Sequence, residues 1–245
     1  MLEGLTMMKT WSFRILVATA ALALCACTPT EQAATQAAPV SQAANATPQP
    51  TVASTAGSPL NPLPGRQAPA LTKIERVEVE TDAGKLVVEV YPEAAPNAAQ
   101  RFLELVEVGF FNDTPVSRVV KSPEPFVAQF GINHQMIDWK ENNFKDDPTF
   151  FALERGTLCF AKAGPDTNST QVFINLRENN HLADPRMNFT VFAKVVDGME
   201  AVDGFKSVGS PDMGLDQDRL WTDPAYLSGL TDKPTMIKSM KKISG

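Results

Sequence analysis

Apolar and polar residues alternate in two neighbouring runs of the chain that are separated by a short turn. In residues 74–81 two valines alternate with two glutamates, and residues 85–91 alternate less regularly. Asp-Ala-Gly at residues 82–84 lies between the two runs. Two period-two runs around a turn that contains glycine predict a β-hairpin.

A helical pattern follows the hairpin. Pro96 and Asn97 stand near the start of residues 98–108, whose apolar residues recur at helical spacing, and Gly109 follows their end. Proline near the start and glycine after the end are typical of an α-helix. We expect a second, short helix over residues 198–205.

Short apolar runs recur along the rest of the chain and predict six further strands. Many short strands with only one or two helices favour a mainly β fold, in the form of a closed antiparallel barrel. The six runs are residues 116–120, 126–130, 156–161, 171–175, 189–195 and 237–243.

The first quarter of the chain has a different pattern. Lys9 and Arg14 precede an apolar run that is typical of a secretory signal and too short for a transmembrane helix. The following stretch, rich in Ala, Pro, Gln, Thr and Ser, cannot bury enough apolar surface to become ordered. We expect a signal peptide over residues 1–26, a disordered tether over residues 27–70 and one folded domain over residues 71–245.

The end of the predicted signal resembles the bacterial lipobox. It reads Leu24-Cys25-Ala26-Cys27, with small residues before a required cysteine. The resemblance implies cleavage before Cys27, lipidation of its thiol, and a domain held in the periplasm of a bacterial cell envelope. Thr28 after the cysteine favours the outer membrane. An ordinary cleaved signal with incidental cysteines is the alternative.

Composition narrows the possible chemistry. The chain has 245 residues and a net charge of −6, which argues against nucleic-acid binding because that function shows a basic footprint. Its three cysteines give no disulfide framework, and Cys159 is expected to be a small buried apolar residue. His134, Asp138 and Glu141 lack the paired spacing of a metal site. We expect a monomer without metal or cofactor.

Residues 156–174 resemble the cyclophilins, a family of peptidyl-prolyl cis-trans isomerases. They contain Ala-Gly-Pro-Asp-Thr-Asn followed by Ser-Thr-Gln-Val-Phe-Ile, with Gly, Pro, Asn and Gln at the offsets of the family. Residues 117–131 and 181–199 resemble two further blocks of that family, and the likeness covers about residues 73–205 and a final strand. It implies a closed eight-stranded antiparallel barrel capped by two helices.

The reaction of that family is rotation about an X-Pro bond, which amide resonance opposes with a barrier of roughly 18–20 kcal/mol. A fixed cation near the prolyl nitrogen would favour the twisted state, and an arginine stays charged. The resemblance implies that Arg118 is this cation and that Gln129 orients it and binds substrate. The implied substrate-binding residues are Phe126, Val127, Ala161, Lys162, Gln171, Phe173, His181, Leu182 and Phe189.

These residues have different implied roles. Apolar side chains would hold the proline ring, whereas Ala161 and Lys162 would bind the peptide through backbone groups, with the Lys162 side chain in solvent. The sequence also departs from the family: Val116-Ser117 stands before the arginine in place of Phe-His, and His181 stands in place of Trp. Residues 207–234 exceed the usual connection and are expected to cover one barrel end.

We therefore expect a prolyl isomerase that acts on proline-containing, unfolded or extended envelope proteins during folding. The departures near Arg118 keep a second hypothesis open, a catalytically weak peptide-binding or chaperone module. A purely structural lipoprotein is a third hypothesis, but it would not require Arg118, Gln129 and Gln171 together.

Overall fold

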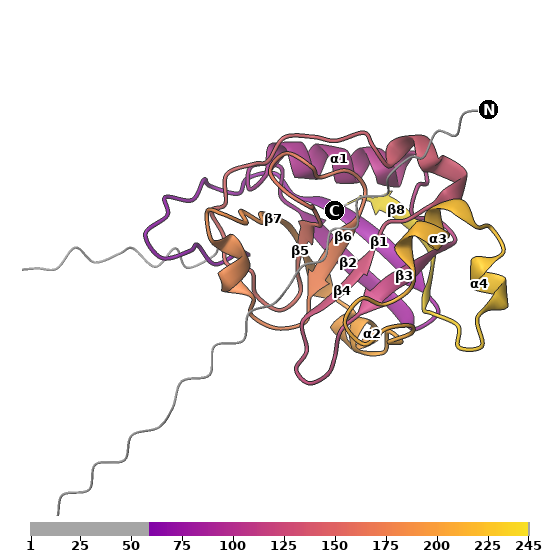
Figure 1. Ribbon diagram of the computed structural model, residues 1–245. Helices are drawn as coiled ribbons and strands as arrows, with labels where there is room; N and C mark the ends of the chain where they lie inside the picture. Colours follow the sequence, from indigo (N-terminus) through magenta and orange to yellow (C-terminus); the bar gives the residue numbers. More distant parts are fainter. Residues whose placement is uncertain (1–58, 245) are drawn as a thin grey trace, which may run out of the picture. The chain divides into compact units, whose positions relative to one another are not determined.

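Eight antiparallel strands close into a barrel in the part of the chain that the structure describes, residues 59–244 of a computed structural model (Figure 1). Their order around the barrel is β1-β2-β7-β5-β6-β4-β3-β8. This confirms the predicted fold. The strands are β1 (Glu75–Thr81), β2 (Gly84–Val90), β3 (Thr114–Val119), β4 (Val127–Phe130), β5 (Thr157–Phe160), β6 (Val172–Asn175), β7 (Val191–Asp197) and β8 (Met236–Ile243).

Helices surround the barrel, and α1 lies along one side of it (Figure 1). The first two correspond to the predicted helices, and α3 and α4 are additional short helices within residues 207–234. The α-helices are α1 (Pro96–Glu107), α2 (Met199–Asp203), α3 (Gln217–Thr222) and α4 (Tyr226–Gly229), and the 3-10 helices are η1 (His134–Trp139) and η2 (Asn180–Ala183).

Alternation along the strands separates two apolar clusters. Ala128 and Ile174 belong to the cluster that fills the barrel, whereas Val127 and Phe173 belong to a second cluster. Cys159 lies in the second cluster with no exposed surface, as expected, and burial raises the pKa of its thiol. The second cluster therefore forms a separate apolar layer outside the barrel interior.

The N-terminus of α1 is capped from a distant part of the chain. Ala95 precedes the helix and offers no side-chain cap. The Asp147 carboxylate instead accepts hydrogen bonds from the backbone N–H groups of Asn97 at 3.2 Å and Ala98 at 2.9 Å. This contact fixes α1 to the loop that precedes β5.

The folded domain begins earlier than the predicted boundary at residue 71. Leu60 is only 1% exposed and packs into the second apolar cluster. The Leu63 N–H donates to the Phe150 carbonyl at 2.9 Å, and the Ala152 N–H donates to the Asn61 carbonyl at 2.8 Å. Residues 59–70 therefore pack on the barrel, because an apolar anchor and backbone pairing together offset their ordering cost.

The predicted signal peptide, Cys27 and the remainder of the tether to residue 58 lie outside the described residues. Within the described part of the chain, no helix has the length and apolar character needed to cross a membrane.

Candidate active site

Arg118 lies on β3 opposite Gln129 of β4 in the strand register. One terminal nitrogen of its guanidinium, Nη1, donates to Gln129 Oε1 at 3.4 Å. Gln129 Nε2 in turn donates to Gln171 Oε1 at 2.8 Å. The two glutamines thus form a hydrogen-bonded chain that ends on the guanidinium.

A second contact fixes Arg118 from the opposite side of the guanidinium. Its Nε donates to the backbone carbonyl of Asp212 at 2.6 Å. The guanidinium carbon also lies 5.8 Å from the ring centre of Phe126, within the range of a cation–π contact. The Asp212 contact was not predicted, because a carbonyl carries no residue-specific signal.

Two opposing effects act on the pKa of Arg118, and burial is the larger. Burial lowers the pKa of the Arg118 guanidinium from its usual value, and the negative charge of Asp212 opposes that shift. Arginine nevertheless stays protonated in proteins. The site therefore presents a permanent cation in partly dry surroundings, where its field is stronger than in water.

A cavity of about 290 Å³ opens beside Arg118. The rings of Phe173 and Phe189 meet edge to face with centres 5.6 Å apart, which stiffens one wall. His181 stacks on Phe126 with ring centres 6.2 Å apart. The cavity is lined by Arg118, Phe126, Val127, Gln129, Ala161, Lys162, Phe173, Leu182, Phe189, Met213 and Gln217.

Every predicted site residue in the described part of the chain is brought together here. Nine of them line the cavity, Gln171 joins through Gln129, and His181 joins through Phe126. Four strands or their ends, the helix η2 and the segment before β7 contribute, so residues far apart in sequence converge on one cavity.

The predicted orientation of the Lys162 side chain is wrong. Its side chain is only 4% exposed, and Nζ lies 2.6 Å from the Asp146 carboxylate. It also donates to the Asn188 carbonyl at 3.1 Å. The carboxylate 16 residues earlier draws the ammonium inward, and spacing alone could not reveal that partner.

Met213 and Gln217 also line the cavity but were not predicted. Both belong to residues 207–234, which have no periodic pattern and exceed the usual family connection. The unusual length of that segment was the only signal that it adds something to the barrel.

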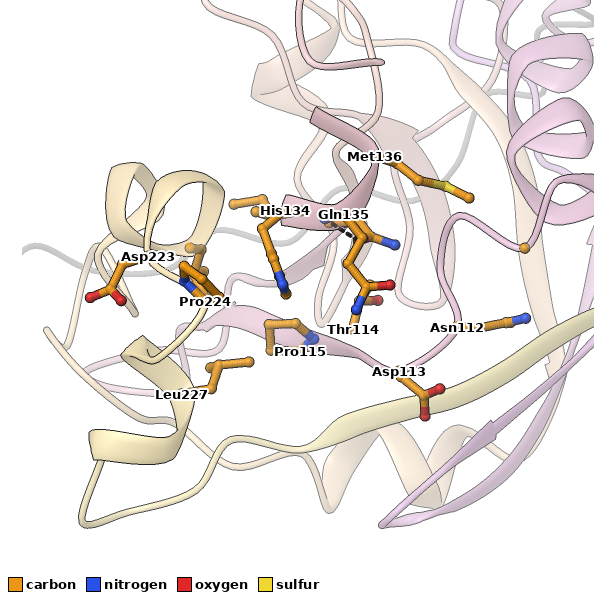
Figure 2. A pocket seen from close by; sticks show the side chains of 14 residues that line it. Asn112, Asp113, Thr114, Pro115, His134, Gln135, Met136, Asp223, Pro224 and Leu227 are labelled. Atoms are coloured by element: carbon orange, nitrogen blue, oxygen red, sulfur yellow. Dashed lines mark hydrogen bonds between the residues drawn. The ribbon is translucent and has the colours of Figure 1, made fainter. Parts of the chain in front are cut away.

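A different cavity, of about 210 Å³, lies between η1, the start of β3 and the α3–α4 segment. Figure 2 shows His134 above Pro115 and beside Pro224, with the Asp223 carboxylate directed away from the histidine ring. The Asp223 carboxylate instead accepts a hydrogen bond from the Arg219 guanidinium at 2.7 Å. In the described part of the chain no three His, Cys, Asp or Glu residues are grouped to hold a metal ion.

The fold and site define a class of protein: a closed β-barrel with a partly apolar cavity beside a fixed guanidinium. Comparison with known proteins makes the class specific. Residues 76–222 match the family described as cyclophilin type peptidyl-prolyl cis-trans isomerase/CLD. The chain therefore belongs to this family and is a cyclophilin-type prolyl isomerase.

Individual relatives agree with that assignment. The chain is 32% identical over 155 residues to a peptidyl-prolyl cis-trans isomerase of Acinetobacter baylyi, covering 58% of this chain and 77% of the relative. It is 30% identical over 155 residues to peptidyl-prolyl cis-trans isomerase B of Escherichia coli, covering 58% of this chain and 90% of the relative.

Solved structures share the fold. A cyclophilin type isomerase from Cryptosporidium parvum superposes with a TM-score of 0.53 at 23% identity, covering 71% of this chain and 99% of that one. A second structure of the same protein, determined in the presence of the dipeptide Ala-Pro, gives a TM-score of 0.54 at 22% identity and covers 69% and 99% of the two chains.

Proposed function

We propose that this prolyl isomerase acts on X-Pro bonds in unfolded or extended envelope proteins during their folding, from a lipid anchor at Cys27. The observation that carries the catalytic part is the placement of Arg118 at the edge of a cavity of about 290 Å³ that Phe126, Phe173 and other apolar side chains line. The rotation breaks no bond and transfers no proton, so the proposal includes no metal or cofactor.

Catalysis follows from preferential binding of the twisted amide. In the planar amide the prolyl nitrogen shares its lone pair with the carbonyl, and in the twisted state that lone pair becomes localised. The apolar cavity holds the ring while the Arg118 guanidinium donates towards the nitrogen. Because the two glutamines and the Asp212 carbonyl fix the guanidinium beforehand, little reorganisation is needed during the rotation.

A protease-coupled proline peptide assay on the full chain tests the catalytic role of Arg118. We expect Arg118→Ala to lower kcat/KM by about 10²–10³, the usual effect of removing one preorganised donor. Arg155→Ala is the matched control, since Arg155 is exposed and pairs with Asp203 away from the cavity. An unchanged rate for the Arg118 variant would remove this residue from the mechanism.

Support for an envelope location comes from the N-terminal sequence. A charged start, an apolar run and Cys27 after small residues resemble a lipoprotein signal. We expect Cys27→Ser to release the protein from membranes in cell fractionation, whereas Cys25→Ser leaves it membrane-bound. Continued membrane association of the Cys27 variant, or equal release of both variants, would contradict the anchor.

The proposal also takes the enzyme to be a monomer. Light scattering on the detergent-solubilised chain checks this, with the detergent mass subtracted. A stable dimer would overturn the expectation.

One observation favours a second candidate function, peptide binding without useful catalysis. Two of the Arg118 nitrogens already donate to protein acceptors, at Asp212 and Gln129. If the remaining donors did not reach the substrate, the cavity would hold proline peptides without accelerating their rotation. Measurable peptide affinity with no rate above background would identify this function and defeat the catalytic account.

A further inference from the structure

The cavity crosses several neighbouring strands, so its two ends are defined by the order of those strands. In the barrel the relevant order is β5-β6-β4-β3. Ala161 follows β5, Phe173 lies on β6, Val127 lies on β4 and Arg118 lies on β3, and all four line the cavity. A peptide held across it has one flank at the β5 end and the other at the β3 end.

Residues 209–217 extend the wall at the β3 end. The Leu215 N–H donates to the Ser117 carbonyl of β3 at 2.8 Å. Ser210 and Gly214 exchange two backbone hydrogen bonds, each at 2.8 Å, which closes the turn that carries residues 211–213. The segment is therefore docked on β3 through its main chain.

Gly214 shows how closely this turn approaches the strand. It has φ = +70°, a conformation that glycine adopts without strain. A Cβ atom at this position would lie 2.3 Å from the Ser117 carbonyl oxygen. Such close packing fixes the position of the turn next to Arg118.

Two side chains of this segment face the same cavity as the catalytic arginine. Met213 is 63% exposed, more than any other large apolar residue within residues 59–244, and it lines the cavity. Gln217 is the first residue of α3, whose start is capped because Asp216 accepts a hydrogen bond from the Arg219 N–H at 3.0 Å. Met213 thus presents a flexible, polarizable apolar side chain to solvent, on a turn whose main chain is hydrogen-bonded to β3.

We infer that Met213 is a specificity-determining residue of the isomerase, which contacts an apolar substrate side chain flanking the proline at the β3 end. Gln217 lies beside it and supplies a polar edge to this subsite. The exposed thioether would lose water when an apolar side chain covers it, which favours binding of such substrates. This inference rests on isomerase activity at the Arg118 site.

The experiment uses two series of X-Pro peptides with the full chain. One series varies the residue before proline and the other varies the residue after it, with Ala, Leu, Phe and Glu in each. We expect one series alone to depend on Met213. In that series, Met213→Ala should reduce the preference in kcat/KM for Leu or Phe over Ala by about tenfold.

Two further variants separate contact from structural damage. Met213→Leu should keep the preference for Leu or Phe over Ala. Met213→Glu should abolish that preference and should also lower kcat/KM for the peptide that carries Glu, because the two carboxylates repel each other. Val196→Ala is the control, because Val196 is 46% exposed on β7 and does not line the cavity. This control should change neither series.

The outcomes distinguish this inference from the proposed function. If the wild type accelerates no peptide, the isomerase mechanism itself fails. If the wild type is active but Met213→Ala leaves both preferences unchanged, or lowers every peptide equally, the subsite is refuted while the mechanism stands. Loss of one apolar preference, restored by Leu, supports the subsite.

Discussion

At the scale of the residue, Arg118 donates to neutral acceptors. The Asp212 carbonyl and the Gln129 amide oxygen fix its direction, and neither is a carboxylate. A carboxylate paired with the guanidinium would neutralise the charge that the twisted amide requires. Neutral acceptors therefore orient the cation without pairing it directly with a carboxylate, although the Asp212 charge lies near enough to stabilise it.

Lys162 shows the opposite arrangement, a cation that is neutralised and buried. Its ammonium pairs with Asp146, whose side chain is 16% exposed and also accepts from Asn168 at 2.6 Å. We expect Lys162→Met to lower the free energy of unfolding by about 3 kcal/mol, because the Asp146 carboxylate then stays buried without its partner. Urea unfolding monitored by fluorescence measures this change.

Lys242→Met is the matched control for that prediction. Lys242 pairs with Glu75 at 2.7 Å, but its side chain is 58% exposed. Solvent screens such a pair, so its loss should change stability much less. Equal effects of the two substitutions would show that burial of the Lys162 pair does not matter.

At the scale of the element, the Asp147 cap of α1 makes stability depend on pH. Burial raises the pKa of Asp147 from its ordinary value of 3.8, helped by the nearby Asp146 charge and opposed by the N–H groups of Ala98 and Asn97. The folded state then holds the proton more tightly than the unfolded state. Ionisation of Asp147 therefore costs stability as pH rises from 3.8 through the raised pKa.

Asp147→Asn tests this sign, because the amide keeps an acceptor for α1 but does not ionise. The stability of the wild type relative to this variant should decrease across that pH window and stay constant above it. Asp147→Ala has no side-chain acceptor for α1, so it should be less stable than Asp147→Asn by about 1 kcal/mol at every pH. Thermal unfolding from pH 3 to 8 provides the data, and a difference that increases with pH would contradict the raised pKa.

Strands were easier to predict from the sequence than the short helices. Period-two alternation predicted the first two strands and short apolar runs predicted the other six, all within a few residues. The strand β1 alternates because it buries one face, whereas β4, β5 and β6 bury both faces and are therefore rich in apolar residues. The helices α3 and α4 have fewer than two turns each, and their burial centres on Trp221 and Tyr226. Their structure depends on tertiary packing, which a periodic pattern does not encode.

The candidate site also contains parts that the sequence predicts and parts that it does not. Side chains with a family position were predicted, whereas the Asp212 carbonyl, the Lys162 ion pair and the Met213 wall were not. Each of these contacts joins segments whose separation in sequence has no fixed rule. The sequence could therefore predict which family-matched side chains meet at the cavity, but not the contacts that hold Arg118 and Lys162 or the residues that extend the cavity wall.

At the scale of the whole molecule, residues 59–70 support the back of the substrate cavity. Leu60 shares its apolar cluster with Val127, Phe173 and Leu182, which line the cavity. The segment that leads from the proposed tether is thus part of the enzyme. A domain cut at residue 71 would lose this support.

Leu60→Ala tests that support in the full chain. We expect the free energy of unfolding to decrease by about 2–4 kcal/mol, as for other fully buried leucines. Ile74→Ala is the control, because Ile74 is 47% exposed. Chemical denaturation of both variants makes the comparison, and equal stabilities would show that residues 59–70 add nothing to the domain.

The acceptor at position 212 belongs to the peptide backbone, and every amino acid supplies the same oxygen there. Replacement of side chains one at a time would therefore not remove the hydrogen bond between the Asp212 carbonyl and the Arg118 guanidinium. Shortening the turn by a single residue would remove it. Position 212 can therefore change its side chain without loss of this contact, whereas the length of the turn is constrained by the guanidinium beside it.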